Sequence, residues 1–194
     1  RGTTFDDGAT IFDLVIARKH MLAERWEQAL SMYDALPSSF TSLMGPNPAN
    51  LSINDYMEDA GQKNSYTVKQ ILELALKLKS NADQMKEVNA TDKLLYATLL
   101  YNLSFYGKNH YILDNHWNQY GSNAVYYNFD SIDTHIFCNN KDYYEMPFHK
   151  SYQNYFRLTT SEKYAKDALA ILKTGEEKAQ ATFLLAKCWQ KRCP

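Results

Sequence analysis

Apolar residues recur every three or four positions in several segments of the chain, which places them on one side of a helix. The first such segment covers residues 11–22, and a second begins at Trp26 and ends before Pro37. A proline ring has no room inside a helix, so Pro37 marks the end of this segment. Because only a few residues separate the two segments, they predict an antiparallel helical hairpin. The apolar positions of the second segment include Trp26, Ala29, Leu30 and Tyr33.

A second hairpin is predicted at the C-terminal end. Thr159 with Glu162, and Thr174 with Glu177, have the spacing of capping boxes, which begin helices. A tight turn containing Gly175 separates the two expected helices. We expect one face of the last helix to carry Ala179, Thr182, Phe183, Ala186 and Cys193.

Two further helices are predicted between the hairpins, over residues 68–80 and 91–106. The second is apolar nearly all round, which is typical of a helix packed on several sides. Gly107 is expected to cap its C-terminal end. Residues 37–64 contain three prolines and two glycines and lose the helical period, so they predict a long irregular loop.

The aromatic-rich segment 108–156 has the weakest pattern, with one helix expected around 114–120 and another around 143–156. No strand pattern competes with helix anywhere in the chain. The predicted fold is therefore all-α, with about six to eight helices in antiparallel hairpins, stacked as one domain over residues 1–194.

Three segments, residues 17–30, 95–109 and 177–188, carry a resemblance to a known family. Their small and aromatic residues resemble the interior of a tetratricopeptide-type (TPR) helical hairpin, as in cell-envelope proteins of Bacteroides-type bacteria. The most distinctive stretch is Tyr-Asn-x-Ser-x-Tyr-Gly-x-Asn, residues 101–109. A strict 34-residue repeat fails after the first hairpin. The resemblance implies a short, irregular TPR-like α-solenoid, in the envelope or periplasm, that binds a partner on its concave face without catalytic residues.

The two ends of the sequence lead to expectations about a longer parent chain and about self-association. It opens on Arg1 and Gly2 rather than Met, and the last helix stops abruptly before Pro194. We therefore expect it to be a fragment of a longer chain. The alternative is self-association through the last helix, with Phe183 and Trp189 as contacts.

Charge and hydropathy argue against two classes of partner. The chain has 21 basic and 22 acidic residues, and residues 109–149 contain one lysine and no arginine, so we expect no nucleic-acid partner. The longest apolar-rich run, residues 94–101, is shorter than the roughly 20 residues that span a bilayer.

The chemistry-bearing residues show no motif of a catalytic, cofactor or metal site. The five histidines and three cysteines lack the spacing of zinc ligands, and no Gly-x-Ser-x-Gly or glycine-rich phosphate loop is present. We therefore expect no enzyme, no cofactor and no metal. The opposing hypothesis, an unrecognised active site, requires His135, His149 or Cys138 to converge with acidic groups.

The aromatic-rich segment is the one feature with binding potential, because Tyr and Trp offer rigid contact area. We expect a non-enzymatic scaffold that binds another protein or a peptide segment. The alternative is an envelope protein that stacks a glycan on the same aromatic rings. The expected contacts are Asn109, Tyr111, Trp117, Asn118, Tyr120 and Tyr126.

Overall fold

The computed structural model describes residues 6–41, 43–51, 65–84, 89–113 and 153–192. Most of these residues are helical, in agreement with the predicted all-α class. The longer helices are α1 (Asp6–Leu22), α2 (Trp26–Ala35), α4 (Val68–Asp83), α5 (Ala90–Asn102), α11 (Thr159–Ile171) and α12 (Gly175–Arg192). The shorter elements are α3 (Ser38–Thr41), β1 (Met44–Gly45), β2 (Tyr66–Thr67), α6 (His110–Leu113) and α10 (Gln153–Arg157).

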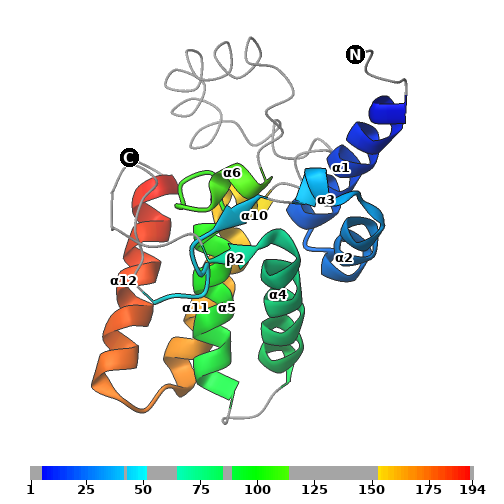
Figure 1. Cartoon of the computed structure of the whole chain (residues 1–194). Helices are drawn as coiled ribbons and strands as arrows, with labels where there is room; N and C mark the ends of the chain where they lie inside the picture. The colour runs from blue at the N-terminus through cyan, green and yellow to red at the C-terminus, as the bar shows by residue number, and fades with distance from the viewer. Residues whose placement is uncertain (1–5, 42, 52–64, 85–88, 114–152, 193–194) are drawn as a thin grey trace.

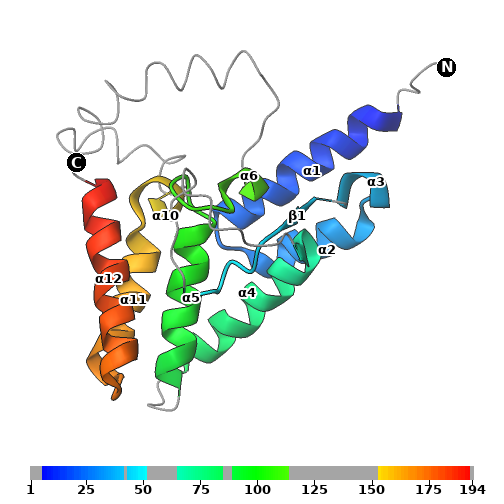
Figure 2. The same ribbon diagram turned by 60° about the vertical axis from the view of Figure 1, so that its left-hand side comes forward.

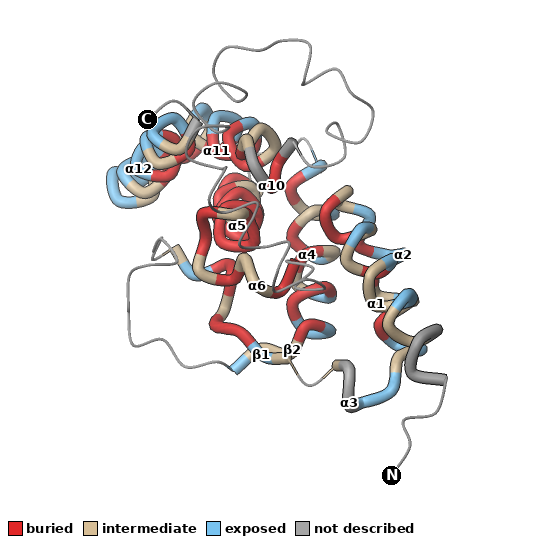
Figure 3. The backbone as a smooth tube through the Cα atoms, turned by 90° about the horizontal axis from the view of Figure 1, so that it is seen from above, coloured by how far each residue is buried: buried red, intermediate tan, exposed pale blue. Residues whose placement is uncertain are grey.

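The six longer helices form a row in which each packs against the next along the chain, from α1 to α12 (Figure 1). Helix α5 lies in the middle, between α4 and α11 (Figure 2). Seen from above, α5 is buried on nearly every side, whereas α12 is exposed on its outer side (Figure 3). The apolar surface predicted all round α5 is therefore covered, as its sequence pattern required.

The first hairpin is confirmed as predicted. Ala17 of α1 and Ala29 of α2 are fully buried, which lets the two helices approach closely, and Trp26 and Tyr33 pack beside them. Between the helices, Glu24 has a left-handed backbone (φ 57°). Its N–H donates to the carbonyl of Met21, a bond typical of a helix C-terminus.

The segment predicted as an irregular loop contains structure that its local sequence does not reveal. Strands β1 and β2 pair antiparallel, with Met44 opposite Thr67 and Gly45 opposite Tyr66. Asn109 donates to the carbonyl of Pro46 at 2.9 Å, and Asn102 donates to that of Pro48 at 2.8 Å. Contacts from distant residues, rather than β propensity, therefore hold this part of the loop.

The end of α5 differs from the prediction. The helix stops at Asn102, its C-cap is Leu103, and Gly107 belongs to the turn that follows. In this turn Asn109 N–H donates to the carbonyl of Asn102 at 2.8 Å. A Cβ on Gly107 would lie 2.3 Å from the Tyr101 carbonyl oxygen, so the turn requires glycine for space rather than as a helix cap.

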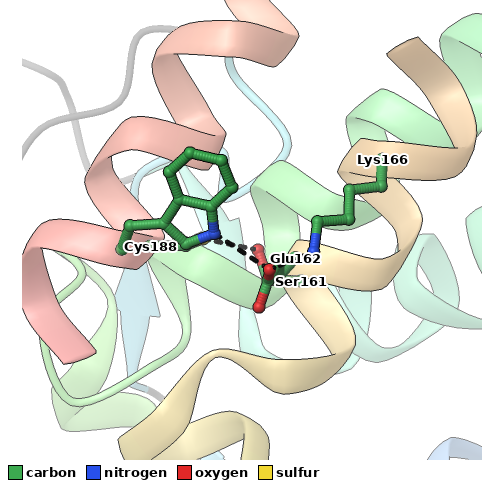
Figure 4. Close-up of polar contacts among 5 residues, drawn as sticks. Ser161, Glu162, Lys166 and Cys188 are labelled. Carbon is green, nitrogen blue, oxygen red and sulfur yellow. Dashed lines mark hydrogen bonds and ion pairs between the residues drawn. The ribbon is translucent and has the colours of Figure 1, made fainter. Parts of the chain in front are cut away.

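One of the two predicted capping boxes is wrong. Helix α11 has Leu158, with a left-handed backbone, as its N-cap, and this residue makes no side-chain capping bond. The Ser161 N–H in the first turn donates to the Asn154 side-chain oxygen at 2.8 Å. The Glu162 carboxylate instead accepts a hydrogen bond from the Trp189 indole at 2.9 Å and pairs with Lys166 at 2.5 Å (Figure 4). These contacts to α12 and to the next turn of α11 engage the Glu162 carboxylate that a capping box would have used. At the start of α12 the Thr174 hydroxyl caps the helix, because it accepts from the Glu177 N–H, and the same hydroxyl donates to the Glu177 carboxylate.

Helix α12 packs through a different face from the one the sequence indicated. Of the expected face, Ala179, Thr182, Phe183 and Ala186 are exposed, and Cys193 lies outside the described residues. The helix has apolar residues on two sides, and the side with the larger aliphatic surface is the one that packs inward. The buried residues are Ala181, Leu184, Leu185 and Cys188.

Other expectations fall on residues that the structure does not describe. These are the helix around 114–120 and most of the helix around 143–156, of which the described part is α10. Within the described residues, no helix has the length and apolar character needed to span a bilayer.

The turn after α5 leads to a test with a matched control. Gly107→Ala is expected to lower the free energy of unfolding by about 2 kcal/mol or more, because the new methyl group meets backbone atoms that cannot move without distortion. Gly175→Ala, at the start of α12, meets nothing within 4 Å and should be neutral or stabilising. Urea denaturation measures both, and equal effects of the two substitutions would contradict this account of the turn.

Candidate functional site

An open cleft lies between the turn that joins α1 to α2 and the C-terminal half of α4, with a volume of about 470 Å³. Its lining is chiefly charged and polar, with carboxylates and cations on both walls. The lining residues are Glu24, Arg25, Trp26, Glu27, Gln28, Leu76, Lys79, Ser80 and Asp83.

Glu24 and Trp26 also border a second, smaller pocket of about 10 Å³. This volume is close to the smallest that holds one water molecule. The two residues therefore stand between the open cleft and the interior of the helical row.

A chain of aromatic and polar contacts runs behind the cleft. The Trp26 indole Nε1–H donates to the Tyr96 hydroxyl at 2.9 Å. The Tyr96 and Tyr164 rings meet edge to face, with their centroids 4.9 Å apart. The Tyr164 hydroxyl donates to the Asp83 carboxylate, which lines the cleft. These four side chains, which we call the seam network, link α2, α5, α11 and the last residue of α4.

Glu24 is the carboxyl group most affected by this environment. Burial raises its pKa above 4.5, and the nearby Asp83 carboxylate adds to the increase. A hydrogen bond with Thr160 and the positive charges of Lys79 and Lys163 oppose the shift. The Lys79 ammonium group also donates to the backbone carbonyl of Glu24 at 3.3 Å, which fixes one wall of the cleft against the other.

The two tyrosines of the seam network remain neutral hydroxyl groups. Burial raises the pKa of both Tyr96 and Tyr164, and the hydrogen bond to Asp83 raises that of Tyr164 further. A neutral hydroxyl can donate and accept at once. The two hydroxyl groups therefore hold Trp26 and the Asp83 carboxylate in fixed positions at the cleft.

Of the residues predicted as partner contacts, the two that the structure describes, Asn109 and Tyr111, do not line this cleft. Asn109 is buried and donates to Pro46, while the Tyr111 hydroxyl donates to the Met44 carbonyl at 3.0 Å. Both therefore help to hold the β1 segment against the end of α5. The others expected to contact a partner are Trp117, Asn118, Tyr120 and Tyr126, and they lie outside the described residues.

The hypothesis of an unrecognised active site rested on His135, His149 and Cys138, which are also outside the described residues. Within the described part of the chain, no three His, Cys, Asp or Glu side chains gather as metal ligands would. The one described cysteine, Cys188, is buried and lies 3.8 Å from the Ser161 hydroxyl (Figure 4).

Sequence reasoning missed most of the cleft. Trp26 was identified, but only as a packing residue of the first hairpin. Glu24, Asp83 and Tyr164 come from three separate segments, and no local spacing connects them. The turn containing Glu24 follows from the short link between the predicted helices, but the hydrogen bond of Glu24 with Thr160 of α11 joins residues more than 130 positions apart.

Comparison of the chain with protein-family models, with curated proteins and with solved structures finds no match. The functional argument therefore rests on the site itself.

The buried hydrogen bond of Trp26 can be tested with two matched substitutions. Tyr96→Phe leaves the buried indole N–H without its acceptor and should cost about 1–3 kcal/mol of unfolding free energy. Tyr111→Phe removes a hydroxyl from an exposed hydrogen bond and should cost less. Thermal or urea unfolding checks both, and a Tyr96→Phe protein as stable as wild type would disprove the network's structural role.

The environment of Glu24 predicts a pH dependence of stability. Because its pKa in the folded protein is raised above 4.5, the folded state holds a proton that the unfolded state releases. The protonated Glu24 carboxyl group therefore stabilises the folded state fully below about pH 4.5. This stabilisation is lost as the pH rises through the raised pKa of Glu24. Glu24→Gln should reduce the slope of unfolding free energy against pH. Glu73→Gln, which replaces an exposed carboxylate on α4, serves as the control. Unchanged slopes in both variants would contradict the burial of Glu24.

Proposed function

We propose that the chain is a non-enzymatic protein-binding module whose cleft between α2 and α4 holds a peptide segment of another protein. In this proposal the hairpins α1–α2, α4–α5 and α11–α12 stack as a short, irregular TPR-like α-solenoid. The packing of each long helix on the next supports such a stack. The resemblance in three segments supports it too, and it alone supports a location in the cell envelope or periplasm.

The chemistry of the cleft carries the proposal. Its walls offer carboxylates from Glu24, Glu27 and Asp83, and cations from Arg25 and Lys79. An extended peptide presents backbone amides and alternating side chains, which match a lining of mixed charge. Trp26, Leu76 and the aliphatic stems of the charged residues add apolar surface, so the expected partner segment carries charges of both signs together with apolar side chains.

The walls of the cleft are already held in place before a partner arrives. Lys79 is bound to the Glu24 carbonyl, and Asp83 is bound to the Tyr164 hydroxyl. Ordering side chains on binding costs about 0.5–1.5 kcal/mol for each one immobilised, so a preformed cleft loses less affinity. Charged groups near the rim, such as Glu27 and Arg25, would chiefly set orientation and association rate.

The alternative of glycan binding remains a prediction. It depended on exposed rings in the aromatic-rich segment, most of which lies outside the described residues. Of its expected contacts, Asn109 and Tyr111 both bond to the backbone of the β1 segment. No observation on the described residues favours a glycan over a peptide.

A site-specific photo-crosslinker tests the proposal. It is placed at Gln28, which is exposed in the cleft, and at Glu73, which is exposed on α4 outside it. After irradiation of the native cell fraction, we expect one protein crosslinked from Gln28 and absent from Glu73. Mass spectrometry of the adduct then identifies the bound segment. Identical products from both positions, or none from Gln28, would contradict binding in the cleft.

The identified segment, as a synthetic peptide, allows a quantitative test. Glu27→Lys reverses a charge in the cleft and should weaken binding by about tenfold, which corresponds to about 1.4 kcal/mol. Glu73→Lys, the same reversal outside the cleft, should leave the affinity unchanged. Isothermal titration calorimetry measures both, and equal effects would place the binding site elsewhere.

A further inference from the structure

The outer face of α12 carries a regular stripe of exposed residues, whose printed contacts, Gln180 with Glu176 and Lys187 with the Phe183 ring, stay within the helix. Glu176, Ala179, Phe183, Ala186 and Gln190 are spaced alternately three and four residues apart. This is the spacing of a helix that packs along a second helix. All five residues are exposed, with Phe183 at 50%, and Figure 3 shows this side of α12 facing away from the helical row.

The stripe has the composition of the helix contacts inside the protein. Within α4, Ala75 and Ala82 are seven residues apart and fully buried where neighbouring helices approach. On α12, Ala179 and Ala186 are also seven residues apart, with the large Phe183 between them. A large side chain beside small ones can interlock with a second surface of the same kind.

The charges of α12 favour one orientation of such a contact. Glu176 lies on the stripe in the first turn, and Lys187 lies beside the stripe toward the end of the helix. Glu177 and Lys191 are not part of this face, because they contact Thr91 and the Tyr106 ring. Two copies of the helix in antiparallel orientation would place the acidic start of each near the basic end of the other. A parallel pair would bring like charges together. Antiparallel helix dipoles add to the preference.

We propose that two copies of this chain form a symmetric dimer through antiparallel contact of their α12 helices. A two-fold axis between Phe183 and Ala186 places the ring of each copy on Ala186 of the other. Such isologous contacts are the commonest way for a protein to pair with itself. Ala179 then faces Gln190 of the second copy, in keeping with the alternating spacing.

Trp189 borders the stripe and extends the apolar contact. It is 55% exposed, yet its indole N–H is bound by Glu162 at 2.9 Å and the Lys166 ammonium group lies 5.8 Å from its ring centroid. Figure 4 shows Glu162 and Lys166 meeting on α11 beside α12. The indole is therefore held in one position before any partner arrives, which lowers the cost of binding.

The proposed dimer leaves the peptide cleft open. The cleft lies between α2 and α4, and helices α5 and α11 separate it from α12 in the row. A dimer would carry two clefts, and two linked sites bind a partner with repeated segments more tightly than one.

The proposal can be tested by exchanging the large residue Phe183 and the small residue Ala186. The 22.5-kDa chain should approach twice that mass in sedimentation as its concentration rises to about 1 mM, a range that covers weak dimers. Phe183→Ala should abolish this increase, and Phe183→Ala with Ala186→Phe should restore it, because the large-on-small contact is rebuilt. Phe12→Ala, at an exposed position on α1, should have no effect. Monomeric wild-type protein, or a dimer unaffected by Phe183→Ala, would overturn the proposal.

Disulfide formation tests the orientation, in a background with Cys138 and Cys193 replaced by serine. A mixture of Ala179→Cys and Gln190→Cys chains should form a mixed disulfide dimer. Ala179→Cys alone should not, because antiparallel pairing separates the two copies of residue 179 by about 16 Å along the helices, beyond disulfide reach. Efficient crosslinking of Ala179→Cys alone would overturn the antiparallel arrangement.

Discussion

The hydrogen bond from the Trp26 indole to the Tyr96 hydroxyl is the contact on which the rest of the arrangement depends. It joins the start of α2 to the middle of α5, two helices that do not follow one another in the row. An indole N–H buried without an acceptor would cost about 1–3 kcal/mol, so the bond constrains where α5 can lie. Tyr96 in turn supports Tyr164 of α11, which holds Asp83.

The candidate cleft follows from the same contact. Trp26 is one of its lining residues, and its walls come from the α1–α2 turn and from α4, which the seam network links through Trp26 and Asp83. Burial of Glu24 between these elements raises its pKa, so the site contains a carboxyl group that readily holds a proton. Trp26 and Asp83 of the seam network thus hold helices together and also line the proposed binding site.

Local patterns predicted the helices well, because helix formation depends on neighbours three and four residues away. The first hairpin follows from Ala17, Trp26 and Ala29. The patterns failed where distant residues decide the outcome. Asn109 was expected to contact a partner, yet its carboxamide holds Pro46, 63 residues earlier in the chain.

Helix α12 shows a second limit of sequence analysis. Both of its sides carry apolar residues, and periodicity alone does not say which side packs inward. The shape of the groove left by α5 and α11 decides this, and it selects Leu184 and Leu185 over Phe183. The candidate cleft was out of reach for a related reason, since Glu24 meets Thr160 and Lys163 of α11 only in the folded chain.

Hydrogen exchange of the indole N–H groups, followed by NMR, is the most direct test of the central contact. Trp26 is 2% exposed and bonded to Tyr96, whereas Trp189 is bonded to Glu162 near the surface. We expect the Trp26 indole proton to exchange only on global unfolding and the Trp189 proton to exchange by local opening, much faster. Equal exchange rates for the two protons would contradict a buried seam network that holds the helices together.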